Sequence, residues 1–252
     1  MTSARYPAVT SISAFFPCYN DEATIASMVK LVLATMDRIG VDGDVIVVDD
    51  GSTDASPYVL KELADIEPRL QVVTHDVNRG YGGALLSGFA AATRQWVFYT
   101  DGDAQFDPCE LELLAARASD DVDVVQGYKI RRGDNLARRV IGRVYHRFVS
   151  IAFGLRIRDT DCDFRLIRKE ALDRIELVHT TGVICVELVR KLQDSGARFV
   201  EVPVHHYPRR YGKSEFFRLS SVVRTLTDLA GLWVRLVLRP RARRPASGPT
   251  AR

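Results

Sequence analysis

Two aspartates separated by one glycine are the first residues of this sequence whose spacing suggests chemistry. Asp101 and Asp103 follow an apolar run at residues 97–100. Residues i and i+2 of an extended chain point the same way, so both carboxylates are expected to face one point. Gly102 lets the backbone turn without a Cβ clash, and Gln105 adds a neutral oxygen. These hard ligands suit Mg²⁺ or Mn²⁺, with substrate phosphates completing the coordination, although Asp-Gly-Asp is also an ordinary turn sequence.

The apolar run before Asp101 belongs to a series that alternates with helical patterns. Strands are expected at residues 12–16, 45–48, 70–73, 96–99 and 122–125, with helices between them. This alternation predicts an α/β fold, a mostly parallel central sheet with helices on both faces. Polar clusters follow four of the strands, namely Tyr19-Asn20, Asp49-Asp50, Asn78-Arg79 and Asp101 to Asp103. Because ligands bind at the carboxyl ends of such strands, the clusters are predicted to converge on one edge.

The second half of the chain departs from this alternation. Its expected elements are an amphipathic helix at 135–153 with arginines on its polar side, a hairpin-like segment at 162–166, a helix at 183–194 and a strand at 198–204. Residues 216–238 predict a last amphipathic helix, which fits either a membrane surface or a protein core. The basic residues of 239–252 are expected to form a disordered tail.

The composition narrows the classes of partner. A chain of 252 residues with 46% hydrophobic residues is long enough to bury the core of one sizeable domain. The net charge is only +3, but acids concentrate in the first half and arginines in the second. An anionic partner is therefore expected to meet the C-terminal half. No DNA-binding motif accompanies the arginines, so nucleic acid is not an expected partner.

The cysteines and the hydropathy point to the cytoplasm. The four cysteines lie far apart and form no metal-ligand or redox pair, which is typical of reduced thiols. The N-terminus shows no basic-then-apolar signal segment. No stretch approaches the roughly 20 apolar residues that span a bilayer. We therefore expect a cytoplasmic protein.

The sequence contains four ordered motifs, namely FPCYNDE at 16–22, VVDDGSTD at 47–54, NRGYGG at 78–83 and TDGDAQ at 100–105. They resemble two nucleotide-binding motifs, a glycine-rich turn and a metal motif of the family 2 glycosyltransferases, which have the GT-A (Rossmann-like) fold. The resemblance implies a GT-A domain over residues 8–215, with the helix at 216–238 and the tail at 239–252 outside it.

Within the family, the chain looks most like the polyprenyl-phosphate sugar synthases of the dolichyl-phosphate mannose synthase type. Gln105 two residues beyond Asp103, the stretch from Gly127 into the arginine-rich helix, and RRYGKS at 209–214 carry this likeness. The sequence departs from the pattern at Lys129, where a Ser-Arg pair is more usual. It also lacks the two C-terminal transmembrane helices of many bacterial relatives.

The resemblance implies an inverting transfer of a sugar from GDP-mannose or a UDP-sugar to a polyprenyl phosphate. Mg²⁺ or Mn²⁺ on Asp101, Asp103 and Gln105 would stabilise the leaving diphosphate, and Lys129 completes the expected catalytic group. The residues expected to bind the nucleotide-sugar are Pro17, Tyr19, Asn20, Glu22, Asp49, Asp50, Arg79, Gly80, Asp101, Gly102, Arg209 and Lys213. Those expected to hold the acceptor phosphate are Lys129, Arg131, Arg138 and Arg139, since Arg forks match phosphate geometry.

Several of these residues also fit plain structural roles. Asp49 fits a helix-capping turn, Arg79 a solvated loop, and each arginine of the basic helix a solvated face. A lipid phosphate is already anionic at neutral pH, so its attack requires no dedicated base. Asp163 is the candidate if a base exists, and otherwise it is a turn acid paired with Arg165.

Two rival functions remain open. One is a family 2 enzyme that glycosylates a soluble sugar or polysaccharide. The other is a non-catalytic nucleotide-sugar-binding subunit that docks on a membrane protein through its last helix, although the intact metal motif argues against it. In the favoured function the protein is peripheral on the inner face of the membrane, where the helix at 216–238 meets the lipid surface or a membrane-protein partner.

Overall fold

The computed structural model describes residues 6–132, 146–209 and 219–238, without the side chains of 131, 132 and 219–224. The predictions for Arg138, Arg139 and Lys213, for the side chain of Arg131 and for residues 239–252 lie outside this part of the chain.

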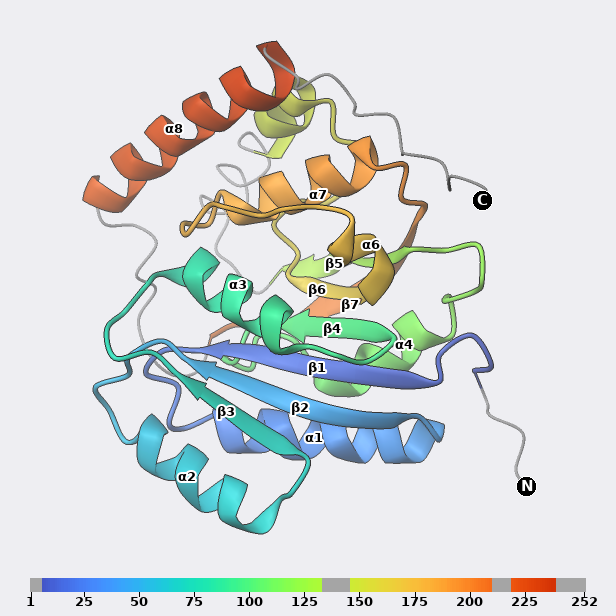
Figure 1. The fold of residues 1–252 in the computed structure, drawn as a ribbon, viewed down its shortest axis with the longest axis vertical. Helices are drawn as coiled ribbons and strands as arrows, with labels where there is room; N and C mark the ends of the chain where they lie inside the picture. Colours follow the sequence, from blue (N-terminus) through green and yellow to red (C-terminus); the bar gives the residue numbers. More distant parts are fainter. Residues whose placement is uncertain (1–5, 133–145, 210–218, 239–252) are drawn as a thin grey trace, which may run out of the picture.

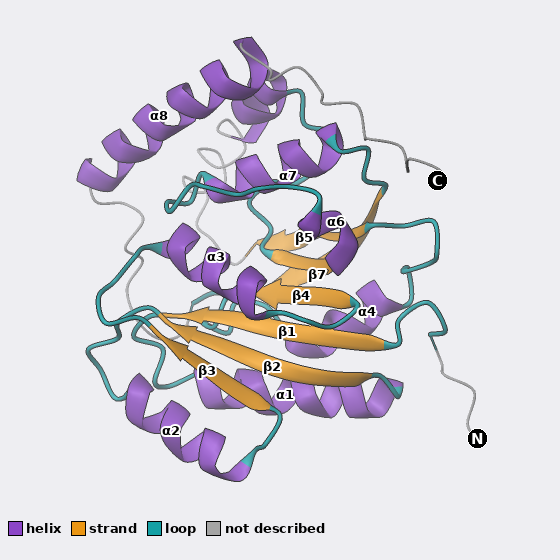
Figure 2. Ribbon diagram, viewed as in Figure 1, coloured by secondary structure: helices purple, strands orange, loops and turns teal. Residues whose placement is uncertain are grey.

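A seven-stranded sheet forms the centre of the described structure (Figures 1 and 2), in the order β3-β2-β1-β4-β6-β5-β7. The strands are β1 (Ser11–Cys18), β2 (Asp42–Asp49), β3 (Leu70–Thr74), β4 (Trp96–Thr100), β5 (Val124–Arg132), β6 (Phe164–Arg168) and β7 (Phe199–His206). All neighbouring strands pair in parallel except β6, which is antiparallel to both β4 and β5. The predicted mostly parallel sheet is confirmed.

The segment expected to be hairpin-like is instead a strand inside the sheet. β6 lies between β4 and β5, and the side chains of Phe164 to Ile167 are all buried. A strand covered on both faces shows no alternation of polar and apolar residues, so its sequence does not reveal this central position.

Helices cover both faces of the sheet, as predicted. They are α1 (Ile25–Ile39), α2 (Ser56–Ile66), α3 (Tyr81–Ala91), α4 (Leu111–Ala115), a helix at 146–153, α6 (Lys169–Asp173), α7 (Ile184–Asp194) and α8 (Leu219–Trp233), which continues as a π-helical turn at Val234–Leu238. Figure 1 shows α1, α2 and α4 on one face and α3, α6 and α7 on the other, with α8 outside α7. No described helix is both long and apolar enough to cross a bilayer.

The two faces of the sheet have separate cores because successive strand residues point to opposite sides. On β1, Phe16 joins the cluster under α1, whereas Phe15 packs with Phe89 of α3 and Tyr99 of β4. A third cluster joins helix 146–153, α7 and α8, and it buries Leu229 and Leu232 of α8. One side of the last helix is therefore a core-packing side.

Candidate active site

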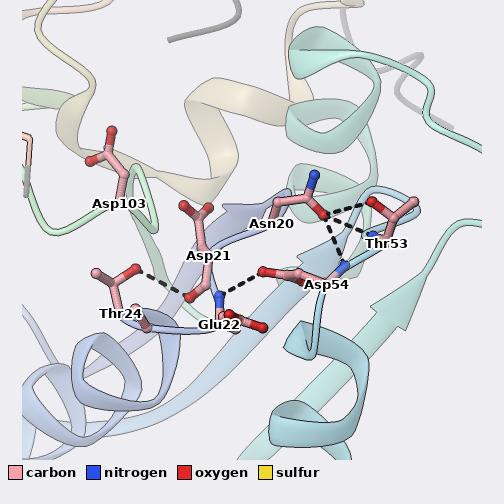
Figure 3. A pocket seen from close by; sticks show the side chains of 8 residues that line it. Asn20, Asp21, Glu22, Thr24, Thr53, Asp54 and Asp103 are labelled. Atoms are coloured by element: carbon pink, nitrogen blue, oxygen red, sulfur yellow. Dashed lines mark hydrogen bonds between the residues drawn. The ribbon is translucent and has the colours of Figure 1, made fainter. Parts of the chain in front are cut away.

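The loops that follow β1, β2 and β4 meet at the carboxyl end of the sheet, as predicted. They enclose a cleft of about 380 Å³ (Figure 3), whose lining residues are Asn20, Asp21, Glu22, Ala23, Thr24, Thr53, Asp54 and Asp103. In Figure 3 the carboxylate of Asp21 stands between Asp103 and Asn20. The first, second and fourth motifs thus share one acidic cleft.

The first two motifs are joined by hydrogen bonds between their loops. Asn20 adopts the left-handed conformation at φ 58°, and its Oδ1 accepts from the backbone N of Thr53 at 2.8 Å and of Asp54 at 3.2 Å. Glu22 accepts from the backbone N of Ala55 at 2.7 Å. Asn20 and Glu22 therefore hold the cleft together, a role that the sequence did not reveal. Pro17 is buried at the end of β1, and Tyr19 is exposed beside the cleft.

The two aspartates at the end of β2 are buried, and they too bind backbone groups. Asp49 Oδ1 accepts from Ser52 N at 3.0 Å, which is a turn role, but it does not cap α2, whose N-cap residue is Ala55. Asp50 accepts from the backbone N of Arg79 at 2.8 Å and of Gly80 at 2.9 Å. Asp50 thereby positions the third motif, where the side chain of Arg79 is exposed. Contact of these residues with a donor stays a prediction.

Two other segments of the chain form hydrogen bonds with the metal motif, namely the start of α3 and the loop after β7. Asp101 Oδ1 accepts a hydrogen bond of 2.9 Å from the hydroxyl of Tyr81. Asp103 Oδ1 accepts from Gln105 N at 3.0 Å, and its Oδ2 accepts from the guanidinium of Arg209. The carboxamide nitrogen of Gln105 donates to the carbonyl of residue 207 at 3.1 Å. The loop after β7 is thus hydrogen-bonded to the metal motif. It places Arg209, which is predicted to bind the nucleotide-sugar, beside Asp103.

The electrostatics of this motif favour a bound cation. Burial, together with the charges of Asp163 and Asp103, raises the pKa of Asp101 well above its usual value. Burial also raises the pKa of Asp103, against the effect of Arg209, and raises that of Asp21 to about 6. A divalent ion would offset this crowding of negative charge, and the oxygen donors match Mg²⁺ or Mn²⁺.

The motif supplies few protein ligands. Among the described residues, no group of three or more His, Cys, Asp or Glu side chains is arranged to hold a metal. If the two carboxylates and the carboxamide oxygen of Gln105 held an ion, its remaining positions would be left to substrate phosphates.

Lys129 lies close enough to the metal motif for its charge to act on both aspartates. Its Nζ donates to the carbonyl of Asp161 at 2.6 Å. Burial opposes its charge, but carboxylates led by that of Asp159 raise its pKa. Lys129 therefore keeps a positive charge beside the carboxylates.

Asp163 is paired with Arg165, as one of its two interpretations predicted. The Arg165 guanidinium is only 1% exposed and donates to Asp163 Oδ1 at 2.9 Å and to Gln126 Oε1 at 2.5 Å. The same Asp163 oxygen also accepts from the Tyr99 hydroxyl at 3.3 Å and the Cys185 thiol at 3.2 Å. This buried network holds Asp163 in place.

Comparisons with known proteins bear on the four motifs. Residues 13–176, more than half of the chain, match the model of glycosyl transferase family 2. Undecaprenyl-phosphate 4-deoxy-4-formamido-L-arabinose transferase of Enterobacter sp. (strain 638) is 29% identical over 214 residues, which are 84% of this chain and 64% of that protein. The chain thus spans somewhat less than two thirds of this relative.

Solved structures show the same fold. Glucosyl-3-phosphoglycerate synthase of Mycobacterium tuberculosis in complex with UDP has a TM-score of 0.67 at 21% identity, over 90% of this chain and 83% of that chain. The same synthase with Mn²⁺, UDP and glucosyl-3-phosphoglycerate gives 0.65 at 21% identity, with the same coverage. The expected GT-A architecture is confirmed. From the match of the family model across three strands of the site and the metal motif, we conclude that the chain belongs to glycosyl transferase family 2.

Proposed function

We propose that this protein transfers a sugar from a nucleotide-diphosphate sugar to the phosphate of a polyprenyl lipid, with Mg²⁺ or Mn²⁺ at Asp101, Asp103 and Gln105. The observation that carries the donor half is the contact between Asp103 and Arg209, which sets an oxygen ligand and a phosphate-binding guanidinium side by side. When bound, the ion supplies a Lewis acid that stabilises the leaving diphosphate. The synthase structures with UDP and Mn²⁺ or Mg²⁺ support this assignment.

Two observations support a lipid phosphate as the acceptor. The Enterobacter relative is named as an undecaprenyl-phosphate sugar transferase. In addition, Asp163 shares its carboxylate with Arg165, Tyr99 and Cys185, an arrangement that suits a structural acid better than a general base. A phosphate oxygen is already a charged nucleophile, and Lys129 would attract it electrostatically.

Exposed apolar side chains on two helices support such an acceptor. Large apolar side chains are exposed on helix 146–153 and on α8 with its π-helical turn, namely Phe148, Ile151, Leu226, Val234 and Leu238. We propose that they meet the inner face of the cytoplasmic membrane. Co-sedimentation with vesicles of anionic lipid tests this. Vesicle binding that is unchanged in a double Phe148→Ser, Ile151→Ser variant would show that these two side chains do not contact the membrane.

The reaction is tested with the purified full chain, Mn²⁺, a short polyprenyl phosphate and a panel of UDP- and GDP-sugars, with mass spectrometry of the lipid. We expect glycolipid from one donor, its loss in Asp103→Asn, and its retention in Asp121→Asn, a matched change at an exposed aspartate that pairs with Arg198. Metal-dependent hydrolysis of a donor without lipid product would favour a soluble acceptor. Donor binding without turnover would favour the partner-subunit function.

A further inference from the structure

Tyr81, the first residue of α3, lies in the third motif, but neither the expected site residues nor the proposed reaction give it a role. It is half-buried against the core on the α3 face of the sheet. Its hydroxyl donates to Asp101 Oδ1 at 2.9 Å, so the third motif contacts the metal motif directly. A carboxylate bonded at one oxygen is restricted in rotation and keeps its other oxygen for a ligand.

We propose that Tyr81 is a positioning residue that orients the Asp101 carboxylate for the metal ion and the donor. This inference rests on the proposed donor and metal site. Hydrogen-bond partners of metal ligands commonly act this way, because they fix the orientation and the basicity of the ligand.

The backbone around Tyr81 is pressed against a second segment, residues 178–181. Gly80 has φ 82°, and Gly82 N donates to the carbonyl of Thr180 at 2.9 Å. A Cβ atom at Gly82 would lie 2.5 Å from the carbonyl oxygen of His179, and one at Gly80 would lie 2.9 Å from that of Thr180. Only glycines allow this approach, which fixes the start of α3 and thus the place of Tyr81.

Segment 178–181 is held in turn by a buried acid. Glu187 of α7 has no exposed surface, and it accepts from the backbone N of Val178 at 3.1 Å and of His179 at 3.0 Å. Its Oε2 also lies 2.8 Å from Nδ1 of His179. These contacts hold the segment to α7.

The last helix also forms hydrogen bonds with segment 178–181. Thr181 donates its hydroxyl to Asp228 of α8 at 2.8 Å. Nη2 of Arg235, in the π-helical turn, lies 2.7 Å from Nε2 of His179. Contacts therefore lead from α8 to segment 178–181, from there to Gly80 and Gly82, and from Tyr81 between these glycines to Asp101. On this proposal the last helix supports the donor site.

Tyr81→Phe removes only the hydroxyl, and Tyr58→Phe is its matched control. The Tyr58 hydroxyl donates to Glu62 at 2.7 Å on the exposed side of α2. The Kd for Mn²⁺ in the presence of UDP or GDP, measured by calorimetry, is a readout independent of turnover. We expect Tyr81→Phe to weaken Mn²⁺ binding by about tenfold or more and to lower kcat, while the variant stays fully folded at the assay temperature. Tyr58→Phe should stay within about twofold of the wild type.

Thr181→Val tests the hydrogen bond between segment 178–181 and α8. It should weaken Mn²⁺ binding in the same direction but less, while Thr10→Val, which removes a hydroxyl bonded to Gln95 at 2.7 Å, should have no effect. If Tyr81→Phe kept the wild-type Mn²⁺ affinity and kcat, the inference about Tyr81 would be overturned and the proposed function would stand. Losses that only track the unfolded fraction would also overturn the inference. Absence of Mn²⁺ binding by the wild type would overturn the proposed metal site and the inference with it.

Discussion

Replacing Arg209 by glutamine is expected to change metal and donor binding in opposite directions. The Arg209 guanidinium donates to the Asp103 carboxylate that the proposed ion would use. The guanidinium and Mn²⁺ would therefore compete for this carboxylate, and Arg209→Gln removes the guanidinium. In the donor complex the same guanidinium would be free to bind the diphosphate, so its loss should weaken donor binding.

The size of the effect follows from the exposure of the pair. The Asp103 side chain is 7% exposed and that of Arg209 is 33% exposed. Exposed ion pairs contribute about 0.2–1 kcal/mol, and hydrogen bonds to charged groups about 1.5–3 kcal/mol. A pair that is buried on one side only should contribute about 1 kcal/mol, which corresponds to about fivefold tighter Mn²⁺ binding in the variant.

The assay is titration of the nucleotide-free protein with Mn²⁺, followed by electron paramagnetic resonance of the free ion. Arg38→Gln is the control, because Arg38 pairs with Glu112 on the surface, away from the cleft. A second titration with UDP or GDP in saturating Mn²⁺ should show weaker nucleotide binding in Arg209→Gln. Equal or weaker Mn²⁺ binding by Arg209→Gln without nucleotide would refute the competition.

Two further predictions concern stability. Arg165→Met removes the guanidinium that donates to Gln126 and Asp163 and leaves Asp163 only the Tyr99 hydroxyl and the Cys185 thiol. The free energy of unfolding in urea should therefore fall by about 3–5 kcal/mol, and an unchanged value would contradict the network. Hydrogen bonds led by that of His179 outweigh burial and lower the pKa of Glu187 from 4.5 to about 2. The ionised Glu187 therefore adds about 3 kcal/mol to the free energy of unfolding above pH 4.5, and this contribution is lost as the pH falls towards 2. Urea unfolding between pH 5 and pH 2 should show this loss of stability in the wild type and not in Glu187→Gln.

The sequence predicted the fold where its patterns are local. Alternating strands and helices gave the parallel sheet and the convergence of loops at its carboxyl end. It did not predict β6 between β4 and β5, because the strand is covered on both faces. It also left the place of α8 open, because a helix packs on a core or meets a membrane with the same apolar spacing. Burial of Leu229 and Leu232 settles one side of that helix.

The sequence predicted which residues lie at the site better than it predicted what each of them contacts. Asp101 and Asp103 follow the end of β4, as predicted, but Gly102 and Asp103 form a turn instead of the extended chain from which the common direction of the two carboxylates was inferred. Asn20 and Asp50, in contrast, bind backbone N–H groups about thirty residues away, and such partners leave no trace in side-chain patterns. The buried Arg165 was equally hidden, since a charged residue in a strand ordinarily indicates an exposed position.

The acceptor is the central claim, and a direct competition tests it. The protein would be given Mn²⁺, its preferred sugar donor and equal concentrations of a short polyprenyl phosphate and phosphoglyceric acid, the ligand of one of the similar solved structures. The account predicts that the sugar appears on the lipid phosphate, with little or none on the soluble acid. Transfer to phosphoglyceric acid with the lipid untouched would contradict it.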